Sequence, residues 1–109
     1  MRASISEEAI RCFDKVIEID PRHTGVWNNK GVSLYSLNRF DEAIKYCERS
    51  LEIEPKNLRA WLTKASCEEK LGQKHKAIHS YKQFIAQAPS QEAKLIERAR
   101  DCLRALDAR

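Results

Sequence analysis

The chain has 109 residues, of which 42% are hydrophobic and 33% charged, a composition typical of one folded domain rather than a disordered segment. No apolar run approaches the roughly 20 residues that a membrane-spanning helix needs, and the N-terminus lacks the apolar segment of a signal peptide. The net charge of +4 is modest, and basic residues alternate with acidic ones, which disfavours nucleic-acid binding. The sequence therefore predicts a cytoplasmic protein with neither a membrane nor a nucleic acid as its partner.

Apolar residues at spacings of three and four predict helices along the whole chain. In chain order these helices are expected over residues 5–19, 24–37, 40–53, 58–71, 74–87 and 91–107. Asn38 and Gly72 each follow a predicted helix, at a position where a left-handed backbone is favoured. Proline disfavours the α conformation in the residue before it, which explains why prolines follow the helices that end near residues 19, 53 and 87.

Four helix starts carry polar residues that are predicted to act as caps. Ser4 is expected to form a capping box with Glu7 at the first helix. The other three expected caps are Thr24, Asn57 and Ser90.

A 34-residue period relates these helices to one another. The period places prolines, Ala-Ile pairs and tryptophans at matching positions: Pro21, Pro55 and Pro89; Ala9-Ile10, Ala43-Ile44 and Ala77-Ile78; Trp27 and Trp61. A fixed period of this length is typical of stacked helical repeats. Such arrays offer extended concave surfaces, so the period favours a binding function over catalysis.

Two copies of one motif follow this period, with a tryptophan, small residues and a closing proline. The first copy has Trp27, Gly31, Leu34, Ala43 and Pro55, and the second has Trp61, Ala65, Ala77, Phe84 and Pro89. The motif resembles the tetratricopeptide repeat. The resemblance covers residues 5–91 and implies an all-α fold: a right-handed α-α superhelix, or solenoid, of antiparallel helix pairs. Its concave groove is lined by the first helix of each pair.

We expect a single domain over residues 1–109. Residues 5–21 are predicted to be the second helix of an incomplete repeat, and residues 24–57 and 58–91 two full repeats. The last helix, 91–107, is expected to cap the array, because one of its faces is apolar and the other charged.

The resemblance implies a protein-interaction module, because family members commonly bind a peptide or a helix of a partner protein in the groove. By alignment to the family, the groove is lined by Asn28, Asn29, Val32, Tyr35, Arg59, Leu62, Thr63, Ser66 and Lys70. The last helix is expected to add Ala93, Ile96, Glu97 and Arg100. The alternative is a structural spacer in a longer solenoid, with no peptide ligand of its own.

Some family members clamp the free C-terminal carboxylate of chaperone peptides with Lys, Arg and Asn on successive first helices. Asn29 and Arg59 match two of these positions, but Thr63 stands where a cation is expected. The remaining Lys and Asn belong to a first helix that this sequence lacks. Because specific binding of a carboxylate needs several converging donors, we do not expect a complete clamp.

No pattern in the sequence indicates catalysis, a metal site or a cofactor. His75 and His79 could share a metal ion across one helical turn, but no third ligand is evident. The cysteines have no zinc-site spacing and are expected to be reduced and partly buried: Cys12, Cys47, Cys67 and Cys102. We therefore expect that the protein is not an enzyme.

Helix 5–19 has apolar residues for two neighbouring helices, but only one neighbour follows it in the chain. Either the chain is a segment of a longer array, or another chain covers the open face. We favour the segment, with homodimer formation as its consequence in isolation. The expected self-association face is Ile5, Ile10, Phe13 and Ile17.

The second full repeat is predicted to be less stable than the first. Glu68 stands where the family usually has a bulky residue, and Lys74 stands where Phe40 lies in the preceding unit. Amide hydrogen exchange should therefore be faster across residues 61–78 than across residues 27–44. Greater protection of residues 61–78 would contradict this prediction.

Overall fold

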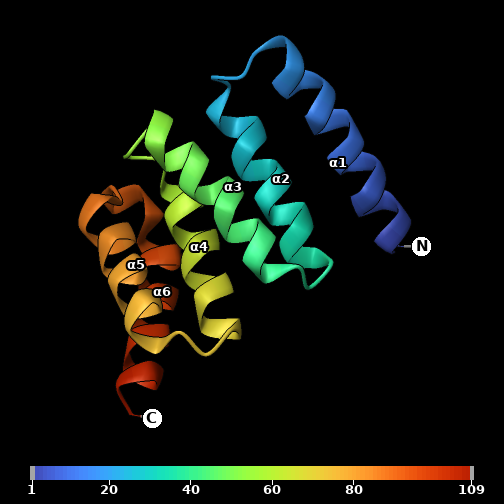
Figure 1. Ribbon diagram of the computed structural model, residues 1–109. Coiled ribbons are helices and arrows are strands. Elements are labelled where there is room, and N and C mark those ends of the chain that lie inside the picture. The colour runs from blue at the N-terminus through green and yellow to red at the C-terminus, as the bar shows by residue number, and fades with distance from the viewer. Residues whose placement is uncertain (1, 109) are drawn as a thin grey trace.

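The computed structural model describes the backbone of residues 2–108 and the side chains of residues 7–108 (Figure 1). Over the described backbone it consists of helices joined by short turns, with no strand. The helices are α1 (Arg2–Ile19), α2 (Thr24–Ser36), α3 (Phe40–Ile53), α4 (Leu58–Lys70), α5 (Lys74–Gln87) and α6 (Ala93–Asp107), with a 3-10 helix η1 (Ser90–Glu92) before α6. The prediction of an all-α fold is confirmed.

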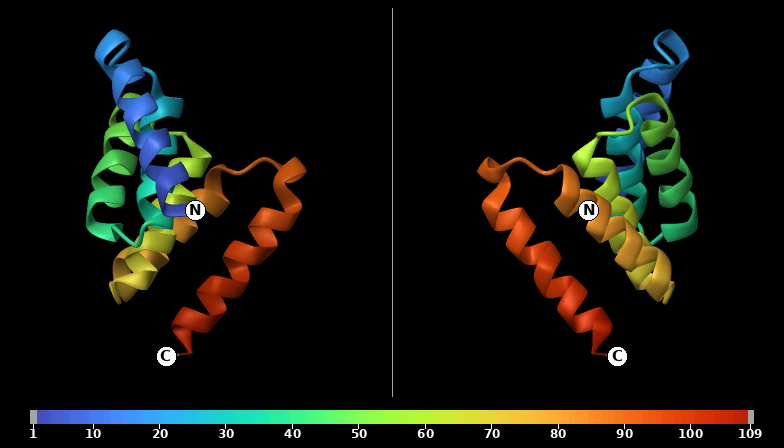
Figure 2. Two further views of the ribbon diagram at one scale, coloured as in Figure 1. Left: turned by 90° about the vertical axis from the view of Figure 1, so that its right-hand side faces the viewer. Right: turned by 90° about the vertical axis from the view of Figure 1, so that its left-hand side faces the viewer.

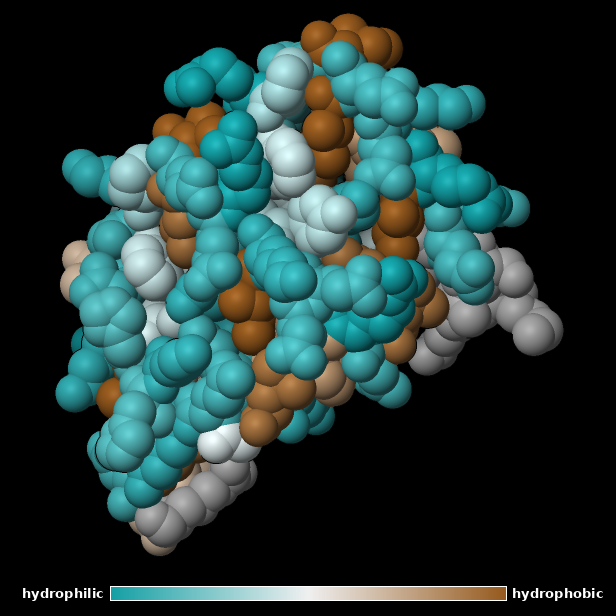
Figure 3. Space-filling view, in the orientation of Figure 1, coloured by the Kyte–Doolittle hydropathy of each residue, from teal (hydrophilic) through white to brown (hydrophobic). Residues whose placement is uncertain are grey.

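The helices stack as a single array in chain order. Helix α2 pairs with α3 and α4 pairs with α5, while α3 also packs on α4, and the two first helices α2 and α4 touch directly. Helix α1 lies against α2 at one end of the array, and α6 packs on α5 at the other (Figures 1 and 2). This is the predicted solenoid of two full repeats, a leading half repeat and a last helix. Charged and polar side chains cover most of the face seen in Figure 3, with narrow apolar strips between them.

Small residues allow the two helices of each repeat to approach closely. A Cβ atom added at Gly31 would lie 3.0 Å from Cys47 Sγ and 3.3 Å from the carbonyl oxygen of Ala43, which is tighter than most Cβ contacts, so α3 would have to shift slightly to accept it. In the second repeat, Ala65 and Ala77 are fully buried. Large side chains such as Leu34, Tyr81 and Phe84 fill the remaining core.

The tryptophans and prolines of the 34-residue period are joined by hydrogen bonds. Trp27 Nε1 donates to the carbonyl oxygen of Pro21 at 2.8 Å, and Trp61 Nε1 donates to that of Pro55 at 2.9 Å. Each bond ties the body of a first helix to the turn before it. The turns inside the repeats also match, because Asn38 has φ 61° and Gly72 has φ 75°, as the sequence predicts.

Three of the predicted caps are wrong. Helix α1 begins at Arg2, so Ser4 lies inside the helix rather than before it. Thr24 is the first residue of α2, whose cap is His23: its Nδ1 accepts from the Val26 amide at 3.2 Å. Ser90 opens the 3-10 helix instead of capping α6. The fourth prediction is confirmed, since the Asn57 side chain accepts from the Ala60 amide.

The buried charge of the second repeat is fully paired. Glu68 is 1% exposed and occupies the position that Leu34 fills in the first repeat. Its carboxylate lies 2.7 Å from Lys64 Nζ and accepts a hydrogen bond from Ser80 Oγ at 2.7 Å. A buried carboxylate is costly unless it is paired, so these partners stabilise the packing of α4 on α5.

Replacing Glu68 with alanine should lower the free energy of unfolding by about 3 kcal/mol, because Lys64 and Ser80 then lose their partner beside a cavity. Glu68→Gln should cost less than half of this, because an amide oxygen can still accept from Ser80. Urea unfolding measures both changes. Glu48→Ala, at an exposed position of α3, is the matched control and should change stability by less than about 0.5 kcal/mol. Equal effects of Glu68→Ala and Glu48→Ala would contradict the role given to the buried carboxylate.

The four cysteines differ sharply in their surroundings. Cys12 is exposed and Cys102 half-buried, whereas Cys47 and Cys67 are buried. Burial raises the pKa of both buried thiols, to about 11 for Cys67, where the Glu68 carboxylate adds to the effect. These two groups therefore stay protonated at pH 8, and a thiolate is the form that reacts.

In dilute native protein at pH 8, Ellman's reagent should react first with Cys12, more slowly with Cys102, and with Cys47 and Cys67 only after the protein unfolds in urea. Mass spectrometry of the quenched protein identifies the modified residues. A single common rate for all four thiols without denaturant would contradict the packing of α3 and α4 described above.

Candidate functional site

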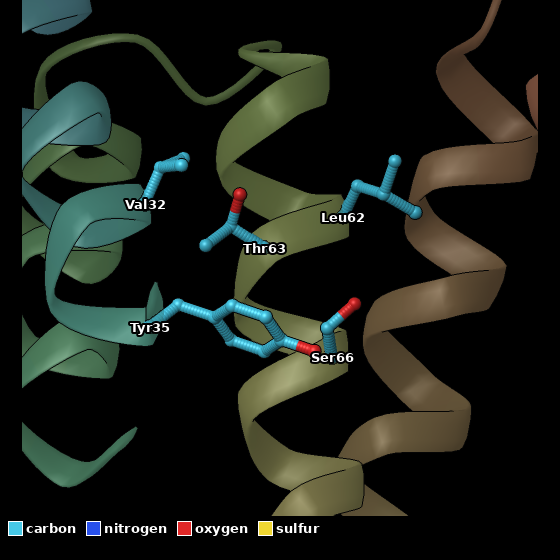
Figure 4. A pocket seen from close by; sticks show the side chains of 5 residues that line it. All are labelled: Val32, Tyr35, Leu62, Thr63 and Ser66. Carbon is cyan, nitrogen blue, oxygen red and sulfur yellow. The ribbon is translucent and has the colours of Figure 1, made fainter. Parts of the chain in front are cut away.

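An apolar hollow of about 240 Å³ lies between the first helices of the two full repeats. Helix α2 contributes Val32 and Tyr35, and α4 contributes Leu62, Thr63 and Ser66 (Figure 4). Residues three or four apart share one face of a helix, so this spacing directs each group toward the same space. All five residues belong to the groove set that the sequence suggested.

Two further hollows continue this surface toward α6. One of about 120 Å³ is lined by Leu62, Ser66, Tyr81, Leu95, Arg98, Ala99 and Cys102. Another of about 340 Å³ is lined by Glu54, Lys56, Asn57, Leu58, Arg59, Leu62, Phe84, Glu92 and Leu95. Leu62 borders all three hollows, so it is the centre of a concave face that runs from α2 across α4 to α6.

The contribution of α6 differs from the one expected. Leu95 and Arg98 line the hollows, whereas Ala93, Ile96, Glu97 and Arg100 do not border any of the three. The reason is that the 3-10 helix delays the start of α6 and the helix then packs on α5.

Positive charge predominates on the part of the concave face that α2 and α4 form. Helix α2 contains no acidic residue. The two acids of α4 are both bonded within the protein, Glu68 to Lys64 and Ser80, and Glu69 to the hydroxyl of Tyr81, which donates at 2.8 Å. Arg59 and Lys70 are exposed, and neither forms an ion pair with any described residue. Burial, together with the hydrogen bond to Glu69, raises the pKa of Tyr81, so its hydroxyl remains a donor.

Two asparagines assigned to the groove lie in different surroundings. Asn29 is exposed on α2, like Arg59 on α4. Asn28 is only 2% exposed, so its side chain is not available at the surface, and its Oδ1 has no hydrogen-bond partner among the described residues. Its assignment to an accessible groove surface is therefore corrected: the side chain of Asn28 faces the interior, while that of Asn29 faces outward.

The expected self-association face of α1 points mostly inward. Ile10, Phe13 and Ile17 are half-buried, and Ile10 packs against the core formed by Leu34 and its neighbours. The side chain of Ile5 lies outside the described residues. The open face of α1 instead carries Cys12, Val16 and Ile19, and the last two are 37% and 85% exposed. The expected face is not free because the contact of α1 with the helices that follow it partly buries Ile10, Phe13 and Ile17.

Other kinds of site find little support in the described part of the chain. It contains no group of three or more His, Cys, Asp or Glu side chains that could hold a metal ion. His75 and His79 are exposed, and His79 meets Trp61 edge-on with ring centroids 6.1 Å apart. None of the described helices is long and apolar enough to cross a membrane.

Comparison with protein families assigns the fold to a class of helical-repeat proteins. Models of the tetratricopeptide repeat match residues 25–57, and residues 6–23 and 58–91. Together these segments account for most of the sequence, and the chain belongs to the tetratricopeptide repeat (TPR) family. Among curated proteins no sequence relative matches.

Solved structures share this fold at low sequence identity. The first TPR of Spaghetti (RPAP3), bound to the HSP90 peptide SRMEEVD, is similar with a TM-score of 0.85 and 19% identity, over 94% of this chain and 80% of that chain. PcrH in complex with the chaperone binding region of PopD has a TM-score of 0.87 and 22% identity, over 97% and 81%. A type III secretion (T3SS) complex from Aeromonas hydrophila has a TM-score of 0.91 and 20% identity, over 97% and 72%. At sequence identities this low, the structural similarity establishes a common fold and nothing more.

Proposed function

We propose that this chain is a protein-interaction module that binds a peptide or a helix of a partner protein on the concave face of α2, α4 and α6. The observation that carries the proposal is the hollow between α2 and α4, where Val32, Tyr35 and Leu62 offer apolar surface beside the hydroxyls of Thr63 and Ser66. An apolar side chain of a ligand can fill such a hollow, while the hydroxyls orient its backbone.

The charge of this face suggests the ligand's chemistry. Arg59 lies one turn before Leu62 and Thr63 on α4, and Lys70 lies one turn after Ser66. Both are exposed cations, and the two acids of α4 are already bonded, while Glu54 and Glu92 line the hollow that contains Arg59. A peptide with an apolar residue flanked by Asp or Glu complements this arrangement.

The solved relatives add support of a general kind. Two of them hold a peptide or a binding region of another protein, as stated above. The proposal for this chain goes no further than a peptide ligand, and the carboxylate-clamp hypothesis remains incomplete because Thr63 supplies no cation.

Peptides selected from a random phage-displayed library on the immobilised protein should carry an apolar residue with nearby acids. Fluorescence polarisation of the synthetic peptides should show at least about ten-fold weaker binding to Val32→Glu and to Arg59→Glu, because each change places a negative charge against the ligand. Val32 is 40% exposed, so its replacement should leave the fold intact. Ala86→Glu, on the exposed surface of α5, is the matched control and should bind normally.

Amidated copies of the same peptides separate the two kinds of groove recognition. Equal binding of free and amidated peptides is the expected result, because a complete carboxylate clamp is not present. Selected peptides that bind Val32→Glu and Arg59→Glu as well as the unchanged protein, or a selection that yields no binder, would favour the spacer function instead.

A further inference from the structure

The three hollows of the concave face differ in the charge of the side chains that line them. The hollow between α2 and α4 is lined by uncharged residues. The hollow that contains Arg59 is lined by two cations and two acids, so its charges balance: Lys56, Arg59, Glu54 and Glu92. The hollow between α4 and α6, here called the Arg98 hollow, is lined by one cation, Arg98, and by none of the described acids. Of the three, it alone carries a net charge, which is positive.

The cation of this hollow has no acidic partner inside the described part of the protein. Arg98 is exposed and forms no ion pair with any described residue. The acids beside it on α6, Glu97 and Asp101, both pair with Arg104 instead. The charge of Arg98 is therefore available to an anion that enters the hollow.

The equivalent cations of the other first helices are paired inside the protein. Lys64 of α4 forms an ion pair with Glu68 one turn further along the helix, and Lys30 of α2 forms one with Asp14 of the preceding helix. On the 34-residue period, the residue of α6 equivalent to Glu68 is Cys102. The helix that precedes α6, which is α5, contains no acidic residue. Neither kind of partner is thus present for the cation of α6.

The other side chains of the Arg98 hollow suit the side chain of an acidic residue. The hydroxyl of Ser66 can rotate to donate a hydrogen bond to a carboxylate, and the guanidinium of Arg98 can donate two. The hydroxyl of Tyr81 donates to Glu69, which does not line the hollow. Apolar surface for the methylene groups of a ligand comes from three residues: Leu62, Leu95 and Ala99.

The Arg98 hollow adjoins the apolar hollow between α2 and α4. Leu62 and Ser66 border both, and Leu62 projects from the side of α4 that is turned away from Val32 (Figure 4). One row of side chains therefore separates the two hollows. An extended peptide places the side chains of residues i and i+2 on the same face, about 7 Å apart, which is enough to span such a row.

We propose that the Arg98 hollow binds the carboxylate of an Asp or Glu that lies two residues from the apolar residue in the hollow between α2 and α4. This inference rests on the proposed function, because both residues belong to the same bound peptide. Arg59 and Lys70 attract an acidic peptide as a whole, whereas Arg98 selects the position of one acid. The ligand is thus an extended segment with an apolar residue and an acid in alternate positions.

A double-mutant cycle tests the pairing of Arg98 with the acid. Peptides selected on the unchanged protein are synthesised with the acid and with its amide, Gln or Asn, two residues from the apolar residue. In fluorescence polarisation the unchanged protein should prefer the acid at least about five-fold, and Arg98→Gln should bind both forms within about two-fold. Arg100→Gln is the matched control and should keep the full preference, because Arg100 is an exposed arginine of α6 that lines none of the three hollows.

The outcomes separate this inference from the proposed function. If Val32→Glu weakens binding but Arg98→Gln keeps the preference for the acid, the peptide occupies the groove and the role given to Arg98 is wrong. An equal loss of preference in Arg98→Gln and Arg100→Gln would show attraction by general positive charge and would overturn the proposal. Selected peptides without an acid two residues from the apolar residue would overturn it too. Circular dichroism checks the fold of each variant.

A small-molecule probe tests the hollow without any peptide. Butanoate copies the side chain of glutamate from Cα outward, and butanamide is its uncharged twin. In isotopically labelled protein, butanoate at concentrations on the order of 10 mM should shift the Nε–Hε signal of Arg98 saturably and leave that of Arg100 unchanged. Butanamide should have no such effect, and the Ala99 amide of Arg98→Gln should not respond to butanoate.

This titration decides the matter if peptide selection yields no binder. A saturable shift of Arg98 without any peptide binder would support the carboxylate site and contradict the peptide-binding function. Equal shifts of Arg98 and Arg100, or no shift of Arg98, would overturn the carboxylate site.

Discussion

The close approach of the two helices in each repeat is the constraint on which the rest of this structure depends. At Gly31 the backbone of α2 comes so near Cys47 and Ala43 of α3 that a Cβ atom would fit only if α3 moved by a few tenths of an ångström. The second repeat solves the same problem with Ala65 and Ala77, both fully buried. Helices that are in close contact on one side stand further apart elsewhere, and the large side chains beside these small residues fill that space. The hollow between α2 and α4 opens on the concave side.

Charged side chains hold the repeats together where apolar packing is incomplete. Lys30 of α2 forms an ion pair with Asp14 of α1, and it donates to Tyr46 Oη of α3 at 3.0 Å. Burial alone lowers the pKa of Lys30, but the bonds to Asp14 and Tyr46 outweigh it and raise the pKa above 10.5. Because the folded-state pKa is the higher one, this contribution to stability is complete below about pH 10.5 and is lost only as the pH rises through the folded-state value.

The sequence predicted the repeats well because period, helix length and proline position all reflect backbone geometry. The resemblance to the repeat family placed Val32, Tyr35 and Leu62 on one surface, and these three residues line one hollow. Prediction from the sequence failed where a choice between competing contacts decides the outcome. His23 caps α2 although Thr24 is the more usual cap, and the backbone before α6 forms a 3-10 turn. The rotation of α6, which brings Leu95 to the groove, follows from packing on α5 and cannot be read from a period.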